Sequence, residues 1–256
     1  MNDLLLDRTP PFATVTLNRA DKRNAITHAM WQGLQRIAAE LASDAALKVV
    51  LLRGAGEVAF SAGADILEMQ QTVSDPQRMR VVQQTVLDAQ ADWERLPMPT
   101  IGLIRGACTG GGCGLALACD LRLATPDAFF AVPPARLGLA YSLADTKRLY
   151  ELVGPSRTKE ILFTARRIGA EEALRLGLIN EIVPPAALES RAHDLAQEIA
   201  ANAANSVRAA KSVVAMLGDG VHHETELSRK PYDDSFASAE FAEGARAFIE
   251  KRPPRF

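Results

Sequence analysis

Two glycine-rich stretches of this sequence have residue types suited to holding a negatively charged oxygen. They are FSAGAD at residues 60–65 and GACTGGGCG at residues 106–114. Small residues let a carbonyl oxygen approach the main chain, and N–H groups fixed near the start of a helix stabilise negative charge that develops on that oxygen. Either stretch alone is explained as well by tight turns. The two together predict an oxyanion hole.

Each glycine-rich stretch follows a run of residues with the pattern of a buried strand. Four strands are predicted in this way: TVTL (14–17), VVLL (49–52), TIGLI (100–104) and DLRLA (120–124). Helical patterns separate them, and residues 27–42 carry apolar side chains at helical spacing behind Thr27, a suitable helix cap. The alternation of strands and helices predicts an α/β fold.

The last part of the chain is predicted to be helical. Strand signals nearly vanish after about residue 170, and helical patterns cover residues 186–204 and 206–217. We therefore expect a core that holds the site at residues 1–185 and a helical C-terminal subdomain at residues 186–256.

The sequence resembles the crotonase family, also called the enoyl-CoA hydratase/isomerase family, over essentially its whole length. The resemblance is carried by LNRADKRNAIT (17–27), FSAGADI (60–66), GGGCGLALACDLRLAT (110–125), LVGPSRTKEILFTAR (152–166), AEEALRLGLINEIVP (170–184) and EGARAFIEKRPPRF (243–256). It implies a spiral of ββα turns and an enzyme that polarises acyl-CoA thioesters with two backbone N–H groups. By that resemblance the donors are the N–H groups of Ala64 and Gly111.

The same resemblance implies a coenzyme A site and an oligomer. Residues at positions matching the family's coenzyme site are Lys22, Arg23, Asn24, Ala25, Ala62, Asp65, Ile66, Phe248 and Lys251. Coenzyme A is then part of the substrate, and no tightly bound cofactor is expected. The C-terminal segment packs against neighbouring subunits in such proteins, so we expect a homotrimer or a dimer of trimers. Each lysine or arginine taken singly is equally compatible with a solvated surface role.

Two acidic residues that hydratases of this family use are absent here. One follows the GGGC stretch and the other lies in a downstream FGxPE pattern, and this chain has Gly114 and Pro134 at the corresponding positions. Neither side chain titrates, so general acid–base catalysis by two carboxylates is not available at these positions. The resemblance therefore implies that enolate stabilisation is retained while the proton chemistry has changed.

Replacement groups are expected in the segment PPARLGLAYSLADTKRL at residues 133–149. Tyr141, Ser142 and Asp145 are its reactive candidates. A tyrosine at this place also occurs in family members that decarboxylate malonyl-type acyl-CoAs, and loss of carbon dioxide forms a thioester enolate without a base. Packing explains Tyr141 equally well, and a helix cap explains Asp145. A protein that binds acyl-CoA without turnover is a further alternative.

Other acidic residues near the two motifs are candidates for a displaced base. They are Glu68, Asp88, Asp92 and Glu94. A solvated helical face accounts for such residues more often than catalysis does.

Composition limits which other classes of function are possible for this protein. With 29 basic and 31 acidic side chains the net charge is −2, which does not favour a nucleic-acid partner. No apolar segment is long enough to span a membrane, and we expect a cytoplasmic protein without membrane attachment. Three cysteines, Cys108, Cys113 and Cys119, lie far in sequence from every histidine, so we expect small core residues and no metal site.

Overall fold

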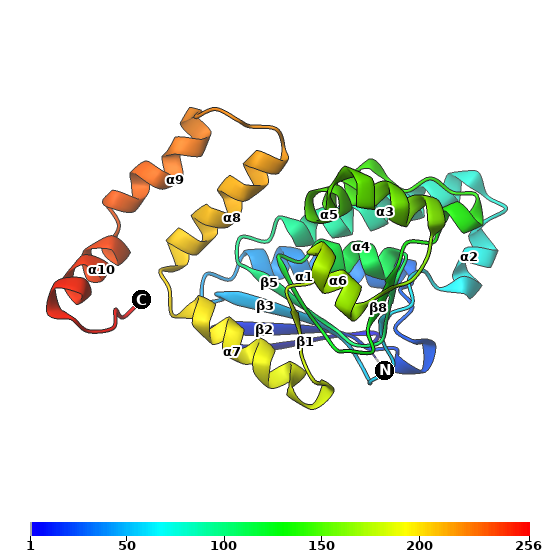
Figure 1. Ribbon diagram of the computed structural model, residues 1–256, viewed down its shortest axis with the longest axis horizontal. Helices are drawn as coiled ribbons and strands as arrows, with labels where there is room; N and C mark the ends of the chain where they lie inside the picture. Colours follow the sequence, from blue (N-terminus) through cyan, green and yellow to red (C-terminus); the bar gives the residue numbers. More distant parts are fainter. Residues whose placement is uncertain (1) are drawn as a thin grey trace.

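The computed structural model describes residues 2–256 and contains two β-sheets with helices around them (Figure 1). The larger sheet consists, in spatial order, of β1 (Leu4–Thr9), β2 (Phe12–Leu17), β3 (Val49–Gly54), β5 (Thr100–Ile104), β7 (Leu121–Ala124) and β10 (Glu181–Ile182). The smaller sheet consists of β4 (Ala59–Ser61), β6 (Ala107–Thr109), β8 (Phe129–Ala131) and β9 (Ile168–Gly169). The β1–β2 and β8–β9 pairs are antiparallel, and the other pairs are parallel.

The chain passes repeatedly from the larger sheet to the smaller one. β3 is followed by β4, β5 by β6 and β7 by β8, and helices then return the chain to the larger sheet. These helices are α2 (Ile66–Thr72) and α3 (Pro76–Glu94) after the first pair and α4 (Gly111–Leu117) after the second. After the third pair, α5 (Leu143–Thr164) leads instead to β9 of the smaller sheet, and the chain reaches β10 of the larger sheet only afterwards. Successive ββα turns of the same hand make the strands parallel. The predicted α/β fold is confirmed.

The larger sheet has an apolar layer on each face. Val50 and Leu52 of β3 face the main core, in which Trp93 is fully buried, whereas Val49 and Leu51 belong to a second cluster. Alternate residues of a strand point to opposite faces, so a strand covered on both faces is apolar throughout. Helix α1 (His28–Ala42) packs against α3 on the core side, and α7 (Leu188–Ala200) covers the second cluster.

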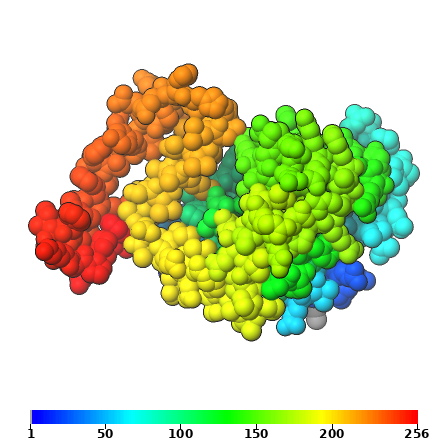
Figure 2. Space-filling view, in the orientation of Figure 1, coloured from blue at the N-terminus to red at the C-terminus, as the bar shows by residue number. Residues whose placement is uncertain are grey.

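The remaining helices are α6 (Ala170–Leu176), α8 (Ala204–Gly218), α9 (Glu226–Phe236) and α10 (Ala239–Glu250). Figures 1 and 2 show α8, α9 and α10 as an arm that projects from the body of the molecule. Large apolar side chains of this arm are exposed: Val213, Val214, Leu217, Leu227, Tyr232, Phe236, Phe241, Phe248 and Ile249. Across residues 2–256, no helix is both long and apolar enough to cross a membrane.

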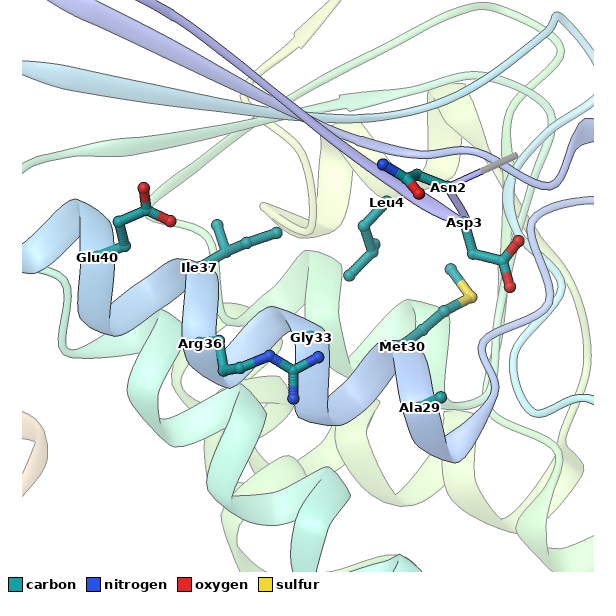
Figure 3. Close-up of a pocket in the computed structure, with 9 residues that line it drawn as sticks. All are labelled: Asn2, Asp3, Leu4, Ala29, Met30, Gly33, Arg36, Ile37 and Glu40. Carbon is teal, nitrogen blue, oxygen red and sulfur yellow. The ribbon is translucent and has the colours of Figure 1, made fainter.

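The first strand crosses α1 above a glycine. Figure 3 shows Leu4 pointing from β1 toward Gly33 in a shallow groove that also includes Asn2, Asp3, Arg36 and Glu40. A Cβ atom at Gly33 would lie 2.6 Å from Leu4 Cδ1. The absence of a side chain at this position therefore lets β1 lie close to the helix, and the groove has charged groups of both signs around an apolar contact.

Candidate functional site

The two glycine-rich stretches of the sequence form neighbouring loops. Ala64 pairs with Ile26 in an isolated parallel bridge, which attaches the first loop to the segment before α1. Gly63 has φ = +93°, and a Cβ atom there would lie 2.8 Å from Thr109 O and 3.5 Å from Gly111 N. Only glycine combines this backbone conformation with so close an approach. The approach brings the residue before Ala64 into contact with the loop that leads to Gly111.

The backbone N–H groups of Ala64 and Gly111 donate no hydrogen bond to any group within residues 2–256. The bridge to Ile26 uses Gly63 O and Asp65 N, which leaves the Ala64 N–H free. Gly111 is the first residue of α4, where an N–H has no partner within its own helix. Two free donors on adjoining loops are suited to a carbonyl oxygen that gains negative charge.

A cavity of about 740 Å³ opens beside these loops. Its apolar wall comes from α2, α3 and the segment before α5 and includes Met69, Val73, Met79, Val82, Leu137 and Leu139. Ala64 lines this cavity directly, and so does Trp31, whose ring lies 3.2 Å from the position of a Cβ on Gly111. The cavity is large enough for an acyl chain. It lies beside the free N–H of Ala64 and against Trp31, whose ring lies close to Gly111.

The residues at positions matching the family's coenzyme site fall into two separate places. Lys22 and Arg23 are exposed beside the first loop, whereas Phe248 and Lys251 lie at the end of α10. Figure 1 shows α10 at the opposite end of the molecule from α2, so one chain does not bring these two groups together. Ile66 is 65% exposed at the start of α2.

Several of those residues have structural roles. Asn24 is fully buried with φ = +54°, and its Nδ2 donates to Ala55 O at 2.9 Å and to Ala59 O at 2.7 Å. Its neighbour Ala25 is buried and accepts a hydrogen bond from the Arg19 guanidinium at 2.7 Å. These contacts hold the segment before α1 in place against the first loop.

Ala62 and Asp65, which belong to the first glycine-rich loop, stabilise that loop. Ala62 N donates to Arg23 O at 2.9 Å, which joins the two chain segments directly. Asp65 caps α2 and binds Arg19 at 2.9 Å. Burial raises the pKa of Asp65, but the Arg19 hydrogen bond and the N–H groups of Leu67 and Glu68 outweigh that effect, so its pKa is lowered.

The position of the first missing acidic residue is filled by other polar groups. Gly114 is buried in α4, and a Cβ atom there would lie 2.3 Å from Gln90 Nε2 and 2.7 Å from Asp145 Oδ1. Gln90 comes from α3 and is 1% exposed. At the second position, Pro134 begins a short 3₁₀ helix (Pro134–Leu137). Gly114 has no room for a side chain between these two groups, and neither Gly114 nor Pro134 has a side chain that can transfer a proton.

A buried polar cluster surrounds Asp145. Ser142 Oγ donates to Asp145 Oδ2 at 2.7 Å, and Arg148 Nη1 donates to Asp145 Oδ1 at 3.2 Å. The same guanidinium binds Gln90 Oε1 at 3.3 Å and Glu94 Oε2 at 2.8 Å. Burial nevertheless raises the pKa of Asp145, with the Ser142 and Arg148 hydrogen bonds opposing it. Ser142, and not Asp145, caps the helix, because its Oγ accepts from Asp145 N at 3.0 Å.

Tyr141 has a buried hydroxyl without a hydrogen-bond partner in the described part of the chain. Burial raises the pKa of this phenol well above its usual range, and the negative charge of the Asp145 carboxylate adds to the effect. Its ring packs against the main core. The preceding residue, Ala140, lines the cavity, whereas Tyr141 lies behind the cavity wall.

The other acidic candidates differ in their positions. Glu68 lines the cavity, and its Oε2 accepts a hydrogen bond from His28 N at 2.6 Å. Asp88 and Asp92 are exposed on α3, and Glu94 pairs with Arg148. Sequence reasoning missed Gln90 and the cavity-lining side chains of Trp31 and His28, because no local pattern distinguishes them from ordinary helix residues.

The cysteines are small core residues, as expected. All three are buried and free, and burial raises the pKa of Cys119 to about 11 and that of Cys108 well above its usual range. A thiol that stays protonated is a poor nucleophile and a poor metal ligand. Within residues 2–256, no group of three or more His, Cys, Asp or Glu side chains has a metal-binding arrangement.

Comparison with known proteins shows the family to which this chain belongs. A model of the family described as Enoyl-CoA hydratase/isomerase matches residues 9–256. The chain belongs to the enoyl-CoA hydratase/isomerase family. It is 33% identical to the short-chain-enoyl-CoA hydratase of Clostridium acetobutylicum, over 98% of this chain and 96% of that one.

Solved structures of the enoyl-CoA hydratase/isomerase family have the same fold. A family member from Hyphomonas neptunium superposes with a TM-score of 0.96 at 39% identity and covers 100% of this chain and 97% of its own. The enoyl-CoA hydratase from Bacillus anthracis gives a TM-score of 0.92 at 33% identity, with coverage of 100% and 99%. The crotonase-type fold is thereby confirmed, and the chain is an enzyme of the enoyl-CoA hydratase family.

Proposed function

We propose that this enzyme acts on an acyl-CoA thioester through an enolate whose oxygen is held by the N–H groups of Ala64 and Gly111. The observation that carries the proposal is the pair of free donors on adjoining loops beside the acyl-sized cavity. Donors fixed in advance stabilise the enolate oxygen more than the neutral carbonyl, so they lower the barrier to enolate formation.

Hydration by two carboxylates is not the reaction that we propose. That mechanism needs one acidic side chain to orient and deprotonate water and another to protonate the α-carbon. Gly114 and Pro134 supply neither, and Gln90 and Asp145 occupy the space beside Gly114. The relatives' names point to enoyl-CoA substrates, and the changed positions favour a reaction with a different proton source.

Decarboxylation of a malonyl-type acyl-CoA is the second candidate. In that reaction the bond to the carboxylate carbon breaks, carbon dioxide leaves, and the electron pair forms the enolate without a base. The observation in its favour is the buried, unpartnered hydroxyl of Tyr141, which directly follows Ala140 of the cavity wall. Tyr141→Phe is expected to slow any decarboxylation without weakening coenzyme A binding, and an unchanged rate would assign the tyrosine to packing.

The coenzyme portion is expected to bind beside Lys22, Arg23, Asp65 and Ile66. Because Phe248 and Lys251 lie at the other end of the molecule, they would contribute to a coenzyme site from a neighbouring subunit. The exposed apolar side chains of α8, α9 and α10 support assembly into a homotrimer or a dimer of trimers, since such surfaces are covered in stable proteins.

The decisive experiment is mass spectrometry of acyl-CoA species after incubation with crotonyl-CoA and, separately, with methylmalonyl-CoA. Gain of water on crotonyl-CoA would show that displaced groups perform the missing acid–base work. Loss of carbon dioxide from methylmalonyl-CoA would favour the second candidate. Binding of both thioesters without turnover of these or any other acyl-CoA would identify a catalytically silent binding protein.

A further inference from the structure

The two glycine-rich loops that carry the proposed donors are anchored to different parts of the fold. The first loop is attached to the segment before α1, because Ile26 N donates to Gly63 O at 2.7 Å. The second loop is attached to the smaller sheet, because Gly110 N donates to Ala131 O at 3.0 Å. These separate anchors do not determine how far apart the two donor N–H groups lie.

One side chain joins the two loops directly. Backbone pairing of β4 with β6 ends at Ser61, before either donor is reached. Beyond that point, Thr109 Oγ1 donates to Ala62 O at 2.7 Å. In the described part of the chain, no other hydrogen bond connects residues 62–64 with residues 109–111. The Thr109 hydroxyl is therefore the polar link between the two donor segments.

This link lies at the same distance along the chain from each donor. Thr109 lies two residues before Gly111, and Ala62 lies two residues before Ala64. The residue directly before each donor is a glycine, with φ of +93° in the first loop and +55° in the second. Glycine restrains the backbone less than any other residue, so hydrogen bonds must hold the donor segments in place.

We propose that Thr109 is a positioning residue whose hydroxyl sets the separation of the Ala64 and Gly111 N–H groups, so that both reach one oxygen. This proposal rests on the enolate function proposed above. Two donors stabilise a single oxygen only when each lies about 2.7–3.1 Å from it. A misplacement of about 1 Å can cost on the order of 10²-fold in rate. Thr109 is not among the residues that line the cavity, so it acts through the backbone that it holds.

Infrared spectroscopy of bound butyryl-CoA, labelled with ¹³C at the thioester carbonyl, measures the two donors without requiring turnover. Hydrogen bonds from both N–H groups should lower the carbonyl stretching frequency in the wild type relative to free butyryl-CoA. Thr109→Val replaces the hydroxyl by a methyl group, which cannot lie 2.7 Å from Ala62 O because carbon–oxygen contacts need about 3.3 Å. The loops must then separate, and one of the two donors loses the carbonyl oxygen.

We expect Thr109→Val to lose about half of the frequency shift and to turn over any acyl-CoA substrate about 10–10²-fold more slowly, while the dissociation constant for butyryl-CoA stays within about threefold. Thr109→Ser keeps the hydroxyl and should retain the wild-type frequency. Thr109→Ala removes the hydrogen bond without pushing the loops apart, so it provides the same comparison if Thr109→Val folds poorly. Its loss of frequency shift should lie between those of the serine and valine variants.

Thr158→Val is the matched control, because Thr158 Oγ1 donates to Gly154 O at 2.8 Å within the single helix α5. It removes a hydroxyl-to-carbonyl bond of similar length but should leave the carbonyl frequency unchanged. A lower Tm in both valine variants with the wild-type frequency in each would show that Thr109 is merely structural and would overturn its positioning role. A wild-type enzyme that binds butyryl-CoA without lowering its carbonyl frequency would instead overturn the proposed oxyanion donors themselves.

Discussion

Gly114, at the position where the resemblance to the family implies an acidic residue, is predicted to tolerate no side chain. In Gly114→Ala the new Cβ would lie 2.3 Å from Gln90 Nε2 and 2.7 Å from Asp145 Oδ1, both shorter than van der Waals contact. Both neighbours are buried and hydrogen-bonded to Arg148, so they cannot move freely. Overpacking of this kind costs about 1–3 kcal/mol. At about 2–4 °C per kcal/mol, Tm should fall by about 2–12 °C.

Thermal unfolding of purified variants measures this effect. Gly169→Ala is the control, because a Cβ atom there meets nothing within 4 Å and its φ of −74° suits any residue. Gln90→Ala combined with Gly114→Ala removes the closest contact, so the double variant should lose less stability than the sum of the two single variants. Equal Tm values for Gly114→Ala and Gly169→Ala would refute the reasoning.

The same crowding bears on activity. Gly114→Glu places an acidic residue where the resemblance to the family implies one, but its Cβ meets the same two neighbours. We expect no gain of water on crotonyl-CoA by mass spectrometry in this variant, because the side chain cannot enter without displacing Gln90. Measurable hydration by Gly114→Glu alone would show that the polar cluster around Asp145 rearranges easily.

Three further perturbations test other parts of the site. Gly111→Pro deletes the proposed donor N–H at a first helical position, where proline is tolerated, and kcat should fall about 10²–10³-fold. Gly111→Ala keeps the N–H and is its control; equal kcat values would contradict the assignment. Arg148→Met leaves the buried Asp145 carboxylate without its cation and should cost about 3–5 kcal/mol in urea unfolding. Adding Asp145→Asn should recover part of that loss, and a full loss in the double variant would be evidence against the pairing. Asp65→Asn tests the lowered pKa of Asp65: the charged form stabilises the fold above the usual carboxyl pKa of 3.8, and this advantage disappears as pH falls through the folded-state pKa. The difference in Tm between Asp65→Asn and the wild type should therefore become smaller in acid. A Tm difference that does not change with pH would contradict the lowered pKa of Asp65.

Elements with strong local patterns were predictable, although β1, which is as long as β2 and β3, was not predicted. The predicted strands at residues 14–17, 49–52, 100–104 and 120–124 correspond to β2, β3, β5 and β7. The four strands of the smaller sheet were not predicted, since each has only two or three residues and periodicity has no length over which to appear. Two of these short strands, β4 and β6, nevertheless lead into the two glycine-rich loops.

The C-terminal prediction was accurate for helices but not for their packing partners. Residues 186–204 and 206–217 correspond closely to α7 and α8. The apolar pattern of α7 does not state which surface it covers, and the structure places it on the outer face of the larger sheet. The apolar face of α8 instead remains exposed in the single chain.

The sequence by itself determined the α/β order, the family resemblance and the absence of carboxylates at Gly114 and Pro134, because residue identities and local periodicity carry this information. Only the tertiary structure decided what fills the space beside Gly114 and which side chains face the cavity. Gln90 reaches the space beside Gly114 from α3, and Asp145 reaches it from α5. His28 contacts Thr85, which is 57 residues away in the sequence. Contacts between such distant segments depend on how all the helices pack together, and no local pattern encodes that packing.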